Sequence, residues 1–261
     1  MDKPFGLRPM VAALICAATA ALFPLIVNGE ESGARWLPFS VAPEREWGGL
    51  VTGEYETRAI GSDDVTLQRY LFRLGTTPLP FLSLWGEGGV AALSLESGSS
   101  SLRGDFGAAF GVGATFAYLG GTNPRLIPFV TGRGTDFISR LGDDADLISG
   151  VNQSRRSRFE WREGSGFAGL GLRLGRGELY GGAGARYMWQ EEQRSLRSHN
   201  TVDHYTYTYR SGVRAGVAAG CRYPLPHRLL LRAEAEVYDG MWRVGLGFGQ
   251  WGMPKSERVG E

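Results

Sequence analysis

The chain has 261 residues, and its 28 lysine and arginine residues balance its 27 aspartate and glutamate residues to a formal net charge of +1. This balance gives no electrostatic reason to expect a nucleic-acid-binding protein or a strongly acidic partner. Glycine is unusually frequent, at 40 residues, but it is spread among aromatic and aliphatic residues, which excludes a collagen-like chain or a flexible linker.

The first 29 residues have the pattern of a secretion signal. Two basic residues precede an apolar run from Met10 to Val27, and the small residues at positions 27 and 29 suit signal peptidase. We therefore predict cleavage after Gly29, with residues 1–29 as a signal peptide and residues 30–46 as a lead-in. The alternative is an uncleaved anchor helix, because the apolar run approaches the length of a membrane span.

From Trp47 onward the apolar residues recur at every second position, which is the spacing of β-strands. The clearest case is residues 105–118, where Phe, Val, Ala and Tyr on one face alternate with a face rich in glycine. We predict ten strands, near residues 47–60, 64–76, 80–92, 105–118, 126–138, 156–174, 177–191, 206–223, 227–238 and 241–251. Eight strands is the alternative, because residues 126–138 alternate poorly and contain Pro128.

The segment from Arg243 to Gly252 contains the spacing G-x-G-x-x-G, formed by Gly247, Gly249 and Gly252. In dinucleotide-binding proteins this motif follows a strand and opens a helix within a βαβ unit. No such context surrounds it here, and large apolar residues alternate with the glycines. The glycines are therefore predicted to form one face of the last strand, and no cofactor is assigned to them.

The connections that follow even-numbered predicted strands differ in length from most of those that follow odd-numbered strands. Those after even-numbered strands are short (TPLP, GGTNPR, RG and PLPH), whereas three of the others are long and polar (SLESGSSSLRG, RLGDDADLISGVNQSR and EQRSLRSHNTVDHY). Short turns at one end and long loops at the other are typical of outer-membrane barrels. If a partner is bound, we expect residues 139–156 and 191–206 to carry the contact, because loops tolerate variation.

Alternation alone does not decide which face is outside, and a secreted soluble carrier with an apolar interior is an alternative. Three features favour a membrane barrel. The predicted strands exceed the usual length of about 5 to 6 residues, the apolar face is rich in alanine, and aromatic residues gather near strand ends as in interfacial girdles. These aromatic residues are Tyr55, Tyr70, Phe106, Tyr118, Tyr187, Trp189, Tyr205, Tyr207, Trp242 and Trp251. We predict an all-β fold, an antiparallel up-and-down transmembrane β-barrel over residues 47–251 with a C-terminal tail at 252–261.

Over residues 45–251 this pattern resembles the small outer-membrane β-barrels related to the transmembrane domain of outer membrane protein A, within the porin-like barrels. The resemblance implies a place in the outer membrane of a Gram-negative bacterium, contact with outer-membrane lipid, and insertion by the barrel assembly machinery. One departure is that such barrels typically finish on an aromatic residue, whereas GMPKSERVGE follows Trp251 here. The strand from Arg243 to Trp251 would then act as an internal assembly signal.

The basic run from Arg155 to Arg162 could contact lipopolysaccharide phosphates. Its alternative interpretation is a solvated strand end with arginines that extend toward water.

Polar residues in two of the predicted loops invite a catalytic interpretation. They are His199, Asp203 and His204 in one loop, Asp143, Asp144 and Asp146 in another, and Ser195 as a nucleophile. They superficially resemble the rim site of the omptin proteases, which sets an acidic pair opposite an Asp-His pair. However, adjacent residues such as Asp203 and His204 point to opposite faces of a strand, and no spacing matches a metal cage or a triad. We assign no catalytic, metal or cofactor residue and predict a protein that is not an enzyme, with a barrel-rim hydrolase as the alternative.

The hairpin AEVYDGMWRVG makes a prediction about the barrel interior. Asp239 and Gly240 form a two-residue turn of the type I′ kind, which sets Glu236 opposite Arg243 on the inner face. Arg232, Glu234, Arg214 and Arg222 are predicted to line the same wall. Opposite charges in a narrow lumen should pair and close it. The predicted role is therefore structural or surface interaction in the cell envelope with a largely closed lumen, and a small passive pore is the alternative.

Overall fold

The computed structural model describes residues 47–251, apart from gaps at 61–62, 80, 98–99, 119–124, 149–150, 175–176 and 199–200. The predicted signal peptide, lead-in and tail lie outside the described residues. The strands are β1 Trp47–Ile60, β2 Asp63–Leu79, β3 Leu82–Ser97, β4 Ser100–Asp105, β5 Gly107–Ala117, β6 Leu126–Ile148, β7 Val151–Leu174, β8 Gly177–Ser198, β9 Thr201–Pro224, β10 Leu229–Tyr238 and β11 Met241–Trp251. One turn of 3₁₀-helix, Pro226–Arg228, joins β9 to β10. No helix in the described part of the chain has the length and apolarity to span a bilayer.

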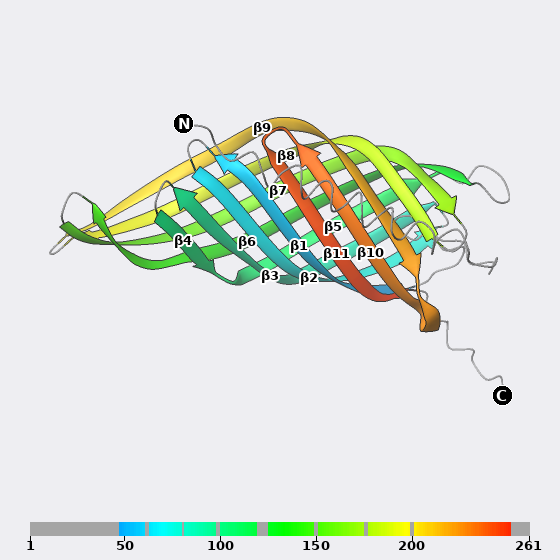
Figure 1. Cartoon of the computed structure of the whole chain (residues 1–261), viewed down its shortest axis with the longest axis horizontal. Helices are drawn as coiled ribbons and strands as arrows, with labels where there is room; N and C mark the ends of the chain where they lie inside the picture. Colours follow the sequence, from blue (N-terminus) through cyan, green and yellow to red (C-terminus); the bar gives the residue numbers. More distant parts are fainter. Residues whose placement is uncertain are drawn as a thin grey trace.

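The strands form one closed antiparallel barrel (Figure 1). Apart from β4 and β5, strands that follow one another in the chain are paired, and β1 pairs with β11 to close the ring. The short strands β4 and β5 lie end to end between β3 and β6, so the eleven segments occupy ten positions. The predicted ten-stranded up-and-down barrel is confirmed. Pro128 is accommodated near the start of β6, where it pairs with Leu170 of β7.

The last strand contains the first two glycines of the G-x-G-x-x-G spacing, and Gly252 lies outside the described residues. A Cβ atom at Gly249 would lie 2.1 Å from the carbonyl oxygen of Gly49 on β1. This glycine therefore serves the close approach of two strands. A Cβ atom at Gly113 on β5 would lie 2.2 Å from the indole of Trp85, which shows how little room the lumen leaves.

The two faces of the barrel differ sharply in chemistry. Large apolar side chains cover the outside, where Phe110 is 63% and Leu246 67% exposed, whereas Arg69 on the inside is 0% exposed. A band of exposed apolar side chains around a closed barrel is the surface that contacts lipid. The alternative of a soluble carrier with an apolar interior is wrong, because the apolar face of the alternation points outward.

Four strands are much longer than the rest. β6, β7, β8 and β9 have 22 to 24 residues each, and they project beyond the barrel as two hairpins, green and yellow at the left of Figure 1. We call residues 142–156 and 189–211 the extension. Pairing continues through it to Ile148↔Val151 and Ser198↔Thr201.

The extension corrects the prediction of long polar loops at 139–156 and 191–206. Only residues 149–150 and 199–200 lie between the paired strands, and β3 and β4 likewise pair through most of SLESGSSSLRG. A strand with polar residues on both faces lacks the alternation that marks a half-buried strand. Its amino-acid sequence therefore resembles that of a polar loop.

A bulge in β9 decides which face of the extension continues the lumen. Between the pairs Arg186↔Arg214 and Met188↔Ser211, β9 advances by three residues while β8 advances by two. The extra residue reverses the alternation of β9 beyond this point. Tyr205, Tyr207 and Tyr209 therefore lie on the inner face, next to Arg194, Glu192 and Gln190 of β8.

Candidate functional site

The barrel interior contains a large set of paired charges, which we call the lumen network. Its members come from eight strands, and their side chains are at most 14% exposed. They are Arg69, Arg73, Arg133, Arg186, Arg232 and Arg243 with Glu54, Glu56, Glu87, Glu163, Glu234 and Glu236. The equal numbers of arginine and glutamate keep the network electrically neutral.

Arg69 of β2 lies at the centre of the network. Its guanidinium nitrogens are 3.1 Å from Glu54, 2.8 Å from Glu56 and 2.5 Å from Glu163. Glu163 belongs to β7, so this last contact crosses the barrel. Arg186 of β8 binds the same two carboxylates, Glu56 and Glu163, and so ties β1 to β7 and β8.

A second set of contacts crosses the lumen beside the first. Arg133 of β6 places its Nη2 atom 2.8 Å from Glu54 of β1 and its Nε atom 2.7 Å from Glu87 of β3. Arg73 of β2 adds a contact of 2.8 Å to Glu87. Glu54, Glu56, Glu87 and Glu163 are each shared by guanidinium groups from different strands, so the network crosses the interior rather than lining one wall.

The predicted register of the β10–β11 hairpin is confirmed. Glu236 pairs in register with Arg243, and the two side chains form a buried ion pair. Arg243 also approaches Glu54 at 3.6 Å, which joins the hairpin to the network. Arg214 differs from the prediction, because its guanidinium donates a hydrogen bond of 2.7 Å to the carbonyl of Asp239 at the turn instead of entering the network.

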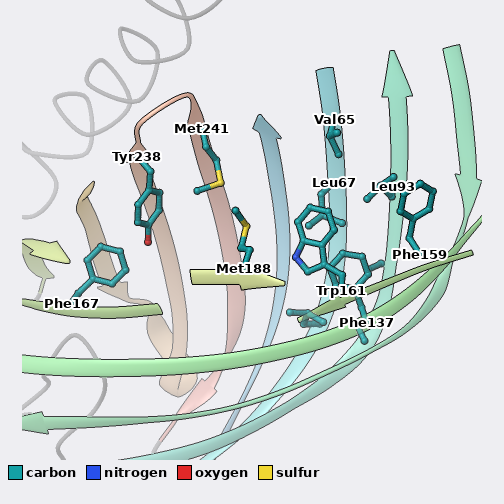
Figure 2. Close-up of a cluster of buried hydrophobic side chains, with 13 residues drawn as sticks. Val65, Leu67, Leu93, Phe137, Phe159, Trp161, Phe167, Met188, Tyr238 and Met241 are labelled. Atoms are coloured by element: carbon teal, nitrogen blue, oxygen red, sulfur yellow. The ribbon is translucent and has the colours of Figure 1, made fainter. Parts of the chain in front are cut away.

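Buried aromatic clusters lie on either side of the network. Toward the extension, Phe137 stacks on Trp161 with ring centroids 5.2 Å apart, and Figure 2 shows both among buried apolar side chains from several strands. The Arg58 guanidinium lies over the Trp161 ring at 3.6 Å. At the short-turn end, Phe129 packs edge-on against Tyr180. The small cavity between the network and this pair is lined by the paired Arg73 and Arg232, among others.

The residues considered for catalysis do not assemble a complete site in the described part of the chain. Ser195 pairs with His204 and its Oγ atom lies 3.0 Å from the His204 Nδ1 atom, but Asp203 pairs with Leu196 and so lies on the opposite face. His199 lies outside the described residues, as do the side chains of Asp143, Asp144 and Asp146. No group of three metal-binding side chains occurs among the described residues.

The basic run from Arg155 to Arg162 lies on β7. Arg158 is 3.0 Å from Glu160, and Arg162 is 3.2 Å from Asp136 while it also lies over the ring of Trp189 at 4.9 Å. These contacts hold both arginines on the outer surface. Contact of this run with lipopolysaccharide stays a prediction.

The aromatic residues predicted for the membrane girdle divide into two groups. Tyr55 packs against Trp242 at 5.4 Å, and Tyr70 packs against Phe106 at 5.9 Å, on the outer wall of the barrel. Tyr205 and Tyr207 instead belong to the extension. With Tyr209 they form a stacked row with centroid distances of 6.3 and 6.4 Å. The guanidinium of Arg194 lies 4.9 Å from the Tyr207 ring.

Comparison with known proteins agrees with this geometry. The translocator domain of the autotransporter NalP from Neisseria meningitidis covers 94% of this chain and 98% of its own, with a TM-score of 0.51 and 8% identity. The chain has the fold of an outer-membrane β-barrel.

Other solved barrels align less closely in space. The outer membrane protease OmpT from Escherichia coli covers 80% of this chain and 95% of its own, with a TM-score of 0.45 and 11% identity. The attachment invasion locus protein Ail of Yersinia pestis covers 80% and 97%, with a TM-score of 0.34 and 14% identity. No family model and no curated protein matches the sequence.

Proposed function

We propose that this protein is a non-enzymatic integral barrel of the Gram-negative outer membrane that holds a rigid sheet outside the cell for contact with a partner, and that its lumen does not conduct. The observation that carries the proposal is the combination of paired charges within the lumen with an extension that lengthens four strands to 22 to 24 residues each. The long connections of such barrels face outward, which supports an extension outside the cell.

The chemistry of the interior supports an anchor rather than a pore. A water-filled channel leaves charged side chains hydrated, whereas Arg69, Arg186 and Glu163 are at most 3% exposed at the side chain and bind one another. The buried aromatic pairs on either side of the network, Phe137 with Trp161 and Phe129 with Tyr180, also support a lumen that does not conduct. Within the network each of the six carboxylates is paired with an arginine, which leaves none of them as a free acid or base.

Recording from planar bilayers tests the closed lumen. The purified protein should give no steady conductance, whereas a variant that combines Arg69→Ala with Arg133→Ala removes two crossing side chains and should leak. Steady, large, porin-like conductance of the unaltered protein would instead make passive diffusion its function. The role of the extension is tested by deleting residues 142–156 and 189–211, which should abolish attachment of cells to any surface that the unaltered protein binds.

A further inference from the structure

One edge of the extension has no neighbouring strand. β9 pairs with β8 from Thr201 to Arg222, but it pairs with β10 only from Gly216 to Pro224. In the described part of the chain, residues 201–215 therefore have a partner on one side only. At roughly 3.3 Å per residue, this is an edge of about 50 Å whose outward N–H and C=O groups are available for pairing.

The sequence of this edge favours strand pairing and lacks the usual protection. Native sheets guard exposed edges with proline, lysine or inward-pointing charges. The segment HYTYTY at residues 204–209 has none of these and consists largely of threonine and tyrosine, which have high strand propensity. The bulge of β9 lies nearer the barrel, beyond Ser211. The stretch before it is thus a regular and unguarded edge.

The side chains beside the edge are already ordered. Tyr205, Tyr207 and Tyr209 form the stacked row on the inner face, and Arg194 holds its middle ring. Thr206 and Thr208 are exposed on the outer face. An added strand would meet three aligned rings on one face and threonine side chains on the other, which are favourable cross-strand neighbours.

We propose that the edge of β9 at residues 201–211 binds an extended segment of another protein outside the cell, which pairs with it as an added β-strand. This inference rests on the proposed function, because it names the kind of partner that the extension contacts. The matching segment would carry aromatic or β-branched residues at alternate positions opposite the tyrosine row.

A second copy in the same membrane does not fit this edge. Two copies in one membrane are related by an axis along the membrane normal. That axis sets each N–H of β9 level with the same N–H of the other copy, so donors face donors and no ladder forms. The geometry therefore points to a polypeptide that is not held beside this barrel in the same membrane.

The test uses the full-length protein in lipid nanodiscs and a labelled synthetic peptide with the sequence of residues 203–210, DHYTYTYR. Free in solution, the peptide is not held by the membrane and can pair antiparallel with the edge. It should bind, and hydrogen exchange should slow at alternate amides between residues 201 and 211. N-methylation of the peptide amides on one edge should weaken binding by about tenfold or more, whereas N-methylation on the other edge should have little effect.

Matched protein variants separate edge pairing from other contacts. Thr206→Lys combined with Thr208→Lys guards the edge and should weaken peptide binding by about tenfold. Gln193→Lys places the same charge on β8 opposite Thr206, away from the edge, and should leave binding unchanged. Unchanged heat-modifiable migration on gels would show that each variant folds.

Three results would overturn the inference: absence of peptide binding, equal binding of the two N-methylated peptides, or binding without slowed exchange in β9. If attachment of cells requires the extension but is unaffected by the two lysines, the edge is not the contact, although the proposed function stands. If deletion of the extension abolishes neither the attachment of cells nor the binding of the peptide, both the inference and the proposed function are wrong.

Discussion

Replacement of Arg69 by methionine tests whether the lumen network holds the barrel together. Methionine keeps most of the side-chain length but removes the charge that contacts Glu54, Glu56 and Glu163 at 3.1, 2.8 and 2.5 Å. Removal of one partner from a buried ion pair typically destabilises a protein by about 3 to 5 kcal/mol. Here all three carboxylates keep another arginine, since Arg186 binds Glu56 and Glu163 and Arg133 binds Glu54. We therefore expect the free energy of unfolding to fall by about 3 kcal/mol, at the lower end of that range.

The measurement is urea unfolding of the purified barrel in liposomes, followed by tryptophan fluorescence and extrapolated to zero denaturant. The matched control is Arg162→Met, because the Arg162–Asp136 pair lies on the outer surface with side chains 59% and 53% exposed. That control should change the free energy of unfolding by less than about 1 kcal/mol. Adding Glu163→Gln to Arg69→Met restores charge balance and should recover part of the loss. A loss below about 1 kcal/mol for Arg69→Met, equal to the control, would refute a dry network and indicate a hydrated lumen.

Three further predictions concern other parts of the molecule. Glu236→Ala should lower the free energy of unfolding by about 1 to 3 kcal/mol, measured by the same urea titration, because the buried Arg243 retains only the longer contact to Glu54. Gly113→Val should destabilise the barrel by about 1 to 3 kcal/mol through its clash with Trp85, whereas Gly164→Ala, where a Cβ atom meets nothing within 4 Å, should be nearly neutral by heat-modifiability on gels. Protease treatment of intact cells should cut the extension near residues 149–150 and 199–200 and spare the turn at residues 175–176; cleavage confined to that turn would reverse the topology.

The parts of the structure that could be predicted from the sequence are those fixed by local rules. The alternation of apolar and small residues gave ten strands, and the turn at Asp239 and Gly240 set the register that pairs Glu236 with Arg243. Both depend on residues close together in the chain. The charged residues of GEYETRAI in β1 can be assigned to the inner face by the same local rule, because Glu54, Glu56 and Arg58 occupy alternate positions on one face.

The rest of the lumen network depends on distant residues. Arg69 and Glu163 are 94 residues apart, and they meet because the tilt and stagger of the closed barrel bring β2 and β7 to the same height across the lumen. Alternation places a charge on the inner face but does not set its height in the barrel. The strands of the extension could not be predicted from the sequence for a different reason. They carry polar residues at consecutive positions, as in GDDAD and NQSRR, so the sequence shows no apolar face from which a strand could be read.

The network and the extension are joined at the base of the long strands. Glu163 of β7 and Arg186 of β8 belong to the network, and each is connected to β1 or β2 on the other side of the barrel. Just beyond them, Arg58 of β1 lies over Trp161 of β7 and donates a hydrogen bond of 3.1 Å to the Gln190 side chain of β8. A long hairpin that leaves a barrel is free to bend at the rim unless its strands are fixed there. The buried charges therefore hold β7 and β8 against the opposite wall at the point where the extension begins.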